Sequence, residues 1–433
     1  MQYYSTNFKS LKVDFKEAAI KGRPADKGLY FPEEIPTLPE DFIANINQYS
    51  SEEIAFEVIY PYVKGIIPAS ELVRILMGTV NFKVPLVKVS KDISSLELFH
   101  GPTLTFKDFG ARFMGYCLEY FVKNQDQKII ALVATSGDAG GAIANSFYDI
   151  EGIEVVILYP SGKLNLVQEK QLTTLGKNIH AVEVNGSFED CRRMMIDAFN
   201  DEELNKKVSL TSAGSGNIAR WLPQQFYYFF AYKQWVDKDN PPVISVPSGN
   251  FGNLSAGLLA SLSGLPIKHF IGACNANDAV TEFLVTEKYL SKKQVNTISH
   301  SMDIGDPINF ARILELFNHH WGDLKKMMSS YNVSDKETTS AIKSVHQKNG
   351  YLFDPHSAVG YVALQQYLHK HPDQKGIVLA TANPAKFFEV VEPIIEEPTS
   401  MPSSVELEFA RPKVGMKINA DVDVLKDFLL TIQ

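Results

Sequence analysis

Cysteine is scarce in this sequence, with three residues in a chain of 433. Cys117, Cys191 and Cys274 lie far apart in apolar or helical surroundings, and none has a second cysteine at the spacing of a metal site. This scarcity excludes a disulfide-built fold and a cysteine-based zinc site as explanations of the sequence. We therefore interpret all three thiols as structural and expect no metal.

Long apolar runs and an excess of basic charge are missing as well. The longest apolar segments, such as IIALVA at 129–134, are far too short to span a bilayer, and the first 15 residues lack the apolar core of a signal peptide. The 42 basic and 50 acidic residues give a net charge of -8, and no basic run marks a nucleic-acid groove. We expect a cytoplasmic protein with no membrane or nucleic-acid partner.

The composition is otherwise that of an ordered globular protein, with 45% hydrophobic and 21% charged residues. The chain is longer than one hydrophobic core usually serves, so two or three domains are expected. Residues 1–85 contain short helical patterns and a Pro-punctuated loop, and we predict a small helical N-terminal domain there, with Ser51 as the N-cap of a helix.

From about residue 86 the chain alternates short apolar runs with helical patterns, which predicts α/β layers with parallel sheets. The runs are KIIALVA, IEVVILYP, NIHAVEV, PPVISVP, PIKHFIGA and GIVLATA. A long helical pattern at 216–236 offers a divide, so we predict one α/β domain at 86–236 and another at 237–433. Pro223 lies inside that pattern and predicts either a kink or a helix that starts there.

The loop in VISVPSGNFGNLSAGLLASL, residues 243–262, is typical of a phosphate cradle between a strand and a helix. Gly249 and Gly252 let the backbone approach a ligand, and the following helix presents free N–H groups to an anion. The spacings of nucleotide loops are absent, so a phosphate monoester fits better. An ordinary Gly-rich turn remains an alternative.

Two more loops follow predicted strands. Thr135, Ser136 and Gly137 supply hydroxyl and backbone donors for a carboxylate, and Asp138 follows as a helix cap or as a group facing a cofactor. Thr381 stands at the end of another strand. Since ligands collect at the carboxyl ends of parallel strands, we expect these loops and the phosphate cradle to converge on one crevice.

Lys107 stands at a predicted helix start between Phe106 and Phe109. A lysine there is ordinarily a solvated side chain. The helix N-terminus and the apolar neighbours both disfavour the charged form, however, and should lower the pKa of Lys107. A neutral amine is what attack on an aldehyde requires, so pyridoxal phosphate would account for both Lys107 and the phosphate cradle.

Several motifs resemble those of the threonine synthase family. FHGPTLTFKDFGARF is similar to its pyridoxal-lysine signature, SGNFGN to its cofactor phosphate loop, and ATSGDAG and TANPAKF to two further loops. YYSTN and KGLYFPEEIP are similar to its N-terminal domain. The resemblance covers residues 1 to about 390. It implies a fold-type II pyridoxal phosphate enzyme of the tryptophan synthase β-like architecture, acting on O-phospho-L-homoserine.

The resemblance also implies roles for single residues. Lys107 would bind the cofactor and then move protons, Thr381 would lie near the pyridine nitrogen, and Asp138 near the 3-hydroxyl. The cofactor phosphate would be held by Gly249, Asn250, Phe251, Gly252 and Asn253. The substrate would be bound by Thr135, Ser136, Gly137, Ser215 and Asn217, with Arg112 as the candidate cation for its phosphate.

The sequence departs from the family pattern at four other positions. Gly214 and Gly216 stand where Asn and Ile are usual, Ala139 replaces a threonine, and Asn383 replaces a histidine. Two alternatives therefore stay open: a serine or threonine dehydratase with the same cofactor, and a pyridoxal phosphate-binding protein with weakened catalysis. A monomer or small homo-oligomer is expected.

Overall fold

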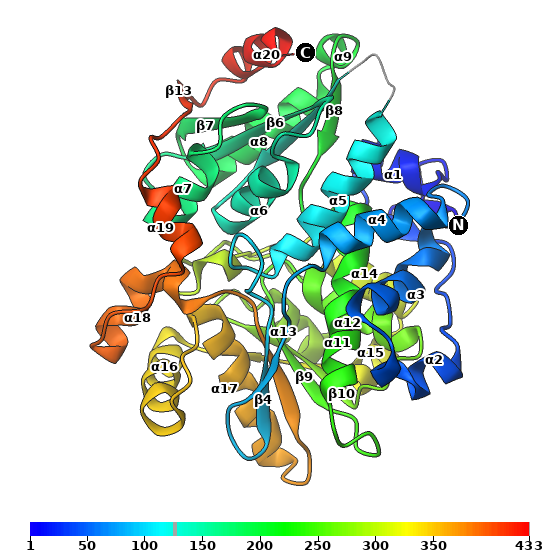
Figure 1. Ribbon diagram of the computed structural model, residues 1–433, viewed down its shortest axis with the longest axis vertical. Coiled ribbons are helices and arrows are strands. Elements are labelled where there is room, and N and C mark those ends of the chain that lie inside the picture. The colour runs from blue at the N-terminus through cyan, green and yellow to red at the C-terminus, as the bar shows by residue number, and fades with distance from the viewer. Residues whose placement is uncertain (124–127, 433) are drawn as a thin grey trace.

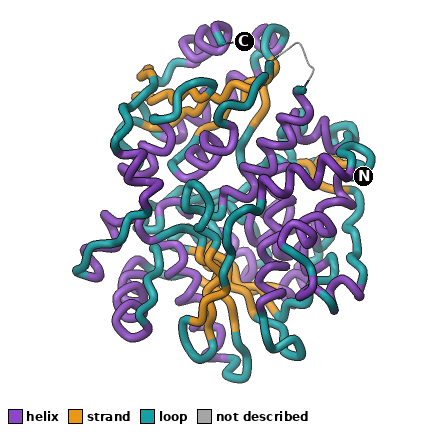
Figure 2. The backbone as a smooth tube through the Cα atoms, viewed as in Figure 1, coloured by secondary structure: helices purple, strands orange, loops and turns teal. Residues whose placement is uncertain are grey.

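The computed structural model describes residues 1–123 and 128–432 and contains two parallel-stranded α/β lobes beside a small N-terminal region (Figure 1). This is the mixed α/β, fold-type II architecture predicted from the sequence. Figure 2 shows the two groups of strands, each flanked by helices. In such parallel-stranded architectures ligands bind at the carboxyl ends of the strands, where strands are joined to helices.

The N-terminal region combines one small antiparallel sheet with four helices. Its strands are β1 (Tyr3–Ser5) and β2 (Tyr30–Pro32), and its helices are α1 (Phe15–Lys21), α2 (Glu40–Ala44), α3 (Ser51–Val63) and α4 (Ala69–Thr79). The N-cap predicted at Ser51 was wrong by one residue. Ser50 accepts the backbone N–H of Glu53, and the Glu53 carboxylate accepts the N–H of Ser50, which closes a capping box around Ser50.

The smaller lobe has an all-parallel sheet of strand order β13-β7-β6-β5-β8. Its strands are β5 (Ile129–Ala134), β6 (Ile153–Pro160), β7 (Ile179–Asn185), β8 (Ser209–Ser212) and β13 (Met416–Asn419). Its helices are α5 (Lys107–Val122), α6 (Asp138–Phe147), α7 (Leu166–Thr173), α8 (Phe188–Asn200), α9 (Glu202–Asn205), α19 (Ser403–Phe409) and α20 (Val422–Thr431).

The larger lobe has a six-stranded sheet of order β11-β10-β9-β12-β4-β3, parallel except for β3. Its strands are β3 (Leu86–Lys88), β4 (Ile93–Glu97), β9 (Val243–Pro247), β10 (His269–Cys274), β11 (Met328–Asn332) and β12 (Gly376–Ala380). Its helices are α10 (Ile218–Trp221), α11 (Phe226–Gln234), α12 (Gly252–Leu262), α13 (Ala279–Thr286), α14 (Phe310–Leu316), α15 (Trp321–Met327), α16 (Asp335–Asn349), α17 (Pro355–Lys370) and α18 (Phe388–Ile395).

The sheets do not follow the domain boundaries predicted at 86–236 and 237–433. Strands β3 and β4 lie in the larger sheet, although they precede the whole smaller sheet in the chain. Strand β13 pairs with β7 of the smaller sheet, although it comes last. The alternating pattern locates strands but carries no information on which sheet a strand joins, because pairing partners are far away in the sequence.

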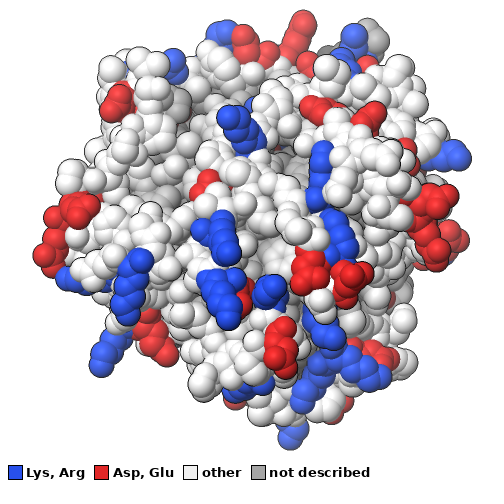
Figure 3. Space-filling view, turned by 60° about the horizontal axis from the view of Figure 1, so that its bottom comes forward, with Lys and Arg blue, Asp and Glu red and all other residues white. Residues whose placement is uncertain are grey.

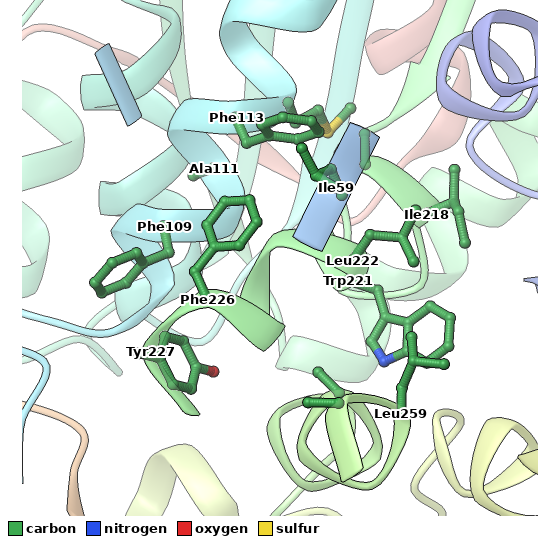
Figure 4. Packing of buried hydrophobic residues seen from close by; sticks show 14 of the residues in the cluster. Ile59, Phe109, Ala111, Phe113, Ile218, Trp221, Leu222, Phe226, Tyr227 and Leu259 are labelled. Atoms are coloured by element: carbon green, nitrogen blue, oxygen red, sulfur yellow. The ribbon is translucent and has the colours of Figure 1, made fainter. Parts of the chain in front are cut away.

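The helical pattern at 216–236 is broken at its proline. Helix α10 ends at Trp221, a 3-10 turn covers Leu222–Gln225, and α11 starts at Phe226. Pro223 has no N–H to donate and interrupts the regular ladder, as predicted. Figure 4 shows how this segment packs its aromatic side chains between Phe109 and Phe113 of α5 and Leu259 of α12, within one buried hydrophobic cluster.

No helix in the described part of the chain is both long and apolar enough to cross a membrane. The three cysteines are free and buried. Within residues 1–123 and 128–432 no cluster of His, Cys, Asp or Glu is arranged to hold a metal ion.

Candidate active site

One cavity of about 410 Å³ lies between the two sheets at the carboxyl ends of their strands. It is lined by the start of α5 and by the loops after β5, β8, β9 and β12. The three loops that the sequence singled out therefore do converge on one crevice. Lys107, Asp138 and Thr381 all line it.

Helix α5 begins at Lys107, as predicted. The preceding turn is held by the buried carboxylate of Asp108, which accepts hydrogen bonds from the backbone N–H and hydroxyl of Thr103. Gly101 is required there, because a Cβ atom would stand 2.4 Å from an oxygen of Asp108. The N–H of Phe106 donates to the carbonyl of Thr381, so the lysine segment is tied to the end of β12.

Among the described residues the amine of Lys107 has one acceptor, Oδ2 of Asp138, at 3.4 Å. Burial lowers the pKa of Lys107, and the charges of Lys386 and Arg220 lower it further, against the opposing effect of Asp138. The lowered pKa predicted from the sequence is confirmed. The amine points into the cavity with a single long contact, which leaves it available to a ligand.

Asp138 lies between two lysines. Burial alone would raise its pKa, but the charges of Lys386 and Lys107 outweigh burial and hold the pKa of Asp138 well below its usual range. Lys386 is fully buried, 3.0 Å from Oδ1 of Asp138, and also donates to the carbonyl of Thr103 and to Oε1 of Gln171. Sequence reasoning missed Lys386, although it belongs to the segment TANPAKF.

The loop after β9 has the geometry of an anion cradle. Phe251 adopts a left-handed backbone conformation (φ 57°), and α12 starts at the next residue, Gly252. No described residue accepts the backbone N–H groups of 250–252. Two buried amide nitrogens beside them also lack partners: Nδ2 of Asn253, and Nδ2 of Asn309, which would lie 3.3 Å from a Cβ at Gly252.

Gly249 belongs to this loop and is also required for packing. A Cβ atom at Gly249 would lie 2.6 Å from Cα of Met302, so only glycine fits beside that backbone. Asn250 fixes the loop from the other side. Its Oδ1 accepts the N–H of Ile308, and its Nδ2 donates to the hydroxyl of Ser215. The cradle and the segment after β8 are thereby joined.

The turn after β5 divides its polar groups between support and ligand binding. The hydroxyl oxygen of Thr135 accepts the N–H groups of Gly137 and Gly140, so it holds the turn. Gly137 has a φ of 140° and packs on Gln168, which no other residue type would tolerate. Ser136 is exposed in the cavity and has no hydrogen bond to any described residue.

The segment after β8 supplies a buried cation that sequence reasoning left without a role. Arg220 is 4% exposed and lines the cavity; its Nη1 donates to the carbonyl of Ala213, and its Nε has no partner in the described chain. Burial lowers the pKa of Arg220 to about 10. A buried guanidinium that faces a cavity and has no carboxylate partner among the described residues is a strong binding site for an oxyanion.

Two residues predicted to bind substrate lie elsewhere. The guanidinium of Arg112 donates to the carbonyl of Gly78 and to the side chain of Asn81, and Arg112 does not line the cavity. It is five residues after Lys107 on α5 and therefore projects from another side of the helix. Asn217 caps α10 and donates to the carbonyls of Ala19 and Ser212, so its polar groups are occupied.

The four departures from the family pattern have different consequences. Gly214, Gly216 and Ala139 line the cavity. Neither glycine has a positive φ, and a Cβ at Gly214 would contact only the hydroxyl of Ser212, so the position has room for a side chain. Asn383 does not line the cavity; it caps a 3-10 turn by accepting the N–H of Ala385.

Comparison with known proteins gives three family matches along the chain. Residues 2–79 match the family of threonine synthase N termini, residues 92–381 match the family of pyridoxal-phosphate dependent enzymes, and residues 357–429 match the threonine synthase C-terminal family. The last match extends to residue 429 and so covers all but the last four residues of the C-terminal part for which the sequence offered no resemblance.

Individual relatives agree with these families. Threonine synthases of Buchnera aphidicola (subspecies Acyrthosiphon pisum) and Escherichia coli are 41% and 38% identical over 99% and 100% of this chain, and each is covered completely. The Escherichia coli crystal structure has a TM-score of 0.92 with full coverage of both chains. A pyridoxal phosphate-bound threonine synthase from Brucella melitensis has a TM-score of 0.92 at 31% identity, over 100% of this chain and 99% of that one. These matches extend over the whole chain, and the chain belongs to the threonine synthase family of pyridoxal phosphate-dependent lyases.

Proposed function

We propose that this enzyme converts O-phospho-L-homoserine and water to L-threonine and inorganic phosphate at the cavity around Lys107. The observation that carries the proposal is a desolvated amine between two separate oxyanion sites, one at residues 250–253 and one at Arg220. A cofactor phosphate and a substrate phosphate require two such sites. A hydrolase for phosphate esters would need only one.

The residues present fit the cofactor. The free N–H groups of 250–252 and the unpaired amide of Asn253 would hold its phosphate, and the cavity next to Gly252 is kept open by the absence of a side chain. Thr381 would lie at the pyridine nitrogen, and Asp138, kept ionised by its two lysines, near the 3-hydroxyl. Bound pyridoxal phosphate supplies an electron sink that stabilises negative charge at the substrate's α- and β-carbons.

Substrate binding follows the groups left without partners. Ser136 and the N–H groups at the start of α6 would take the carboxylate. Arg220, with the hydroxyl of Ser215 beside it, would take the γ-phosphate in place of Arg112. The substrate is thereby held at both ends, which orients its α- and β-carbons toward Lys107.

Lys107 would carry the proton transfers. As a neutral amine it takes the proton from the α-carbon; a β-proton is then lost and the γ-carbon–oxygen bond breaks, which releases phosphate. Water adds at the β-carbon, and protons return to the α- and γ-carbons. The single long contact of Lys107 with Asp138 lets the amine move between these atoms.

We also propose that the enzyme is cytoplasmic, that it is a monomer or small homo-oligomer, and that it acts without nucleic acid. Acidic and basic side chains are interspersed over the face seen in Figure 3 rather than gathered into one basic surface, which supports the last point. Light scattering of the purified protein during size-exclusion chromatography tests the assembly.

Product analysis tests the reaction. The purified enzyme with pyridoxal phosphate is incubated separately with O-phospho-L-homoserine and with L-threonine. We expect threonine and phosphate in equal amounts from the first and little keto acid from the second. Keto acid as the main product would favour the dehydratase alternative, and absence of turnover with a normal cofactor spectrum would favour a protein with weakened catalysis.

Two variants separate the oxyanion sites. Gly252→Asp places a carboxylate at the cradle, and we expect weaker cofactor binding, measured by absorbance titration. Arg220→Met should leave cofactor binding unchanged and lower kcat/KM by about a hundredfold, as expected for a lost charged contact with substrate. Arg112→Met is the control, since its guanidinium bonds the Gly78 carbonyl outside the cavity. Equal losses in both arginine variants would contradict the placement of the substrate phosphate.

A further inference from the structure

Two more arginines, Arg23 and Arg192, line the cavity on the side that opens to solvent. Arg23 comes from the loop after α1 in the N-terminal region, and Arg192 from α8 in the smaller lobe. The side chain of Arg192 is 46% exposed, and Arg23 is partly buried. Neither takes part in the chemistry described above.

The position of Arg23 is built into the fold. Gly22, with a φ of 70°, ends α1, and a Cβ atom there would lie 2.8 Å from the carbonyl oxygen of Ser212. Asn217 bonds the carbonyls of Ala19 and Ser212 together from the other side. The N-terminal region is therefore fastened to the end of β8, and Arg23 is delivered to the rim of the cavity.

The charge of Arg23 is not neutralised by any described residue. Its Nη2 donates to the carbonyl of Lys27, its Nε is buried without a partner, and no carboxylate lies within ion-pair distance in the described chain. Burial lowers the pKa of Arg23, and the nearby charge of Arg192 lowers it further. Within residues 1–123 and 128–432, the one ion-pair partner of Arg192 is Glu189, whose side chain is 70% exposed.

Two like charges beside a cavity are stabilised by an anion between them. The cavity, about 410 Å³ in volume, has room for one, and Gly214 and Gly216, which also line it, contribute no side chains. Arginine is the side chain best matched to phosphate oxygens. We propose that Arg23 and Arg192 form an outer oxyanion site, which binds the phosphate of an incoming phosphorylated substrate and the inorganic phosphate that leaves.

The identity of the substrate rests on the proposed function, but the outer oxyanion site does not. A dianionic phosphate attracted to the rim would reach Arg220 within the same cavity. Electrostatic attraction of this kind acts on the rate of association and weakens with salt. The outer oxyanion site should therefore affect kcat/KM more than kcat.

Direct binding of inorganic phosphate is the first test. It is titrated calorimetrically into the cofactor-loaded Arg220→Met enzyme, so that neither the cradle nor the inner arginine competes. We expect binding to persist, and to weaken about tenfold on adding Arg192→Gln and further on adding Arg23→Met. Arg193→Gln is the control, because Arg193 is the next residue on α8, pairs with Asp190 and does not line the cavity.

Equal phosphate affinity with and without Arg23 and Arg192 would overturn the proposal, as would an equal effect of Arg193→Gln. The cofactor spectrum of each variant confirms that it has folded. The second test separates substrate from free phosphate. With Arg220 present, Arg192→Gln should lower kcat/KM for the phosphorylated substrate about threefold to tenfold and flatten its salt dependence, with kcat nearly unchanged.

If Arg192→Gln weakens phosphate binding but leaves the salt dependence of kcat/KM unchanged, the outer oxyanion site binds only the phosphate product. Its proposed role in capturing the phosphorylated substrate would then be overturned. If the enzyme fails to turn over O-phospho-L-homoserine, the calorimetric test still decides whether the outer oxyanion site exists. Failure of the proposed function and failure of this inference are thereby distinguishable.

Discussion

Two segments far apart in the chain, 98–113 and 381–388, each bring a lysine to the same carboxylate, Asp138. Lys386 is fully buried and has three oxygen acceptors, from Asp138, Thr103 and Gln171. Lys107 has a single acceptor at 3.4 Å and faces a cavity. The lysine with a full set of partners holds the structure, and the lysine with one long contact is free to react.

Lys386 changes the effect that Asp138 has on the pKa of Lys107. A carboxylate with Lys107 as its sole partner would bind the ammonium form and raise its pKa. Lys386 takes up much of the negative charge of Asp138 and by its own charge lowers the pKa of Lys107. We therefore infer that Lys386 is a positioning residue, which would act on the proposed reaction through Asp138.

The largest expected effect comes from removing the free amine. Lys107→Ala should reduce turnover by at least about a thousandfold, because it deletes both the cofactor attachment and the proton carrier. The yellow, borohydride-reducible chromophore should disappear with it. If this variant retains a reducible chromophore, another lysine binds the cofactor, and Lys386 is the first to examine.

The second effect comes from removing the paired amine. Lys386→Met should destabilise the protein by about 3 kcal/mol, since it leaves a buried carboxylate short of a partner. Urea unfolding measures this loss, and Lys128→Met, which breaks a surface pair with Glu154, is the control. The pKa of Lys107 should rise in Lys386→Met, measured in the cofactor-free enzyme from the pH dependence of its reaction with an amine reagent. An unchanged pKa would contradict the positioning role.

The smallest expected effect is a pH dependence of stability that comes from Glu408 of α19, whose carboxylate interacts electrostatically with Lys386. Burial raises the pKa of Glu408 to about 7, against the opposing charges of Lys386 and Arg411. The folded state then binds a proton more tightly than the unfolded state, so stability falls as pH rises from about 4 to about 7. We expect Glu408→Gln to be more stable than the parent by about 1 kcal/mol at pH 8, after allowance for partial exposure, and equal to it near pH 4. Urea unfolding at the two pH values measures this difference, and a pH-independent difference would place the effect elsewhere.

The sequence predicted the parts of the site that depend on local pattern. A strand followed by a Gly-rich turn and a helix start is readable from a few residues, and so were the cradle, the turn at 135–137 and the position of Lys107. Arg112, Arg220 and Lys386 could not be placed in this way. Which side of a helix faces the cavity, and which cation is left without partners, depend on contacts between segments far apart in the chain.

The same dependence on distant contacts explains why the two sheets do not follow the predicted domain boundaries. Ile93 of β4 pairs with Gly376 of β12, and Met416 of β13 pairs with Val182 of β7. The larger sheet therefore takes strands that precede and follow β5–β8 in the chain, and the smaller sheet takes a strand that follows the whole larger sheet. The alternating pattern is equally compatible with two consecutive domains. Only pairing between distant strands separates the two possibilities.

This interleaving has a consequence for how the protein is made. Strand β12 lies between β9 and β4 in the larger sheet, so that sheet cannot be completed on the ribosome until residue 380 has emerged. Strand β13 closes the smaller sheet later still. Such non-local pairing slows folding and exposes unpaired strand edges in the growing chain. Synthesis is therefore a stage at which this enzyme needs protection from aggregation.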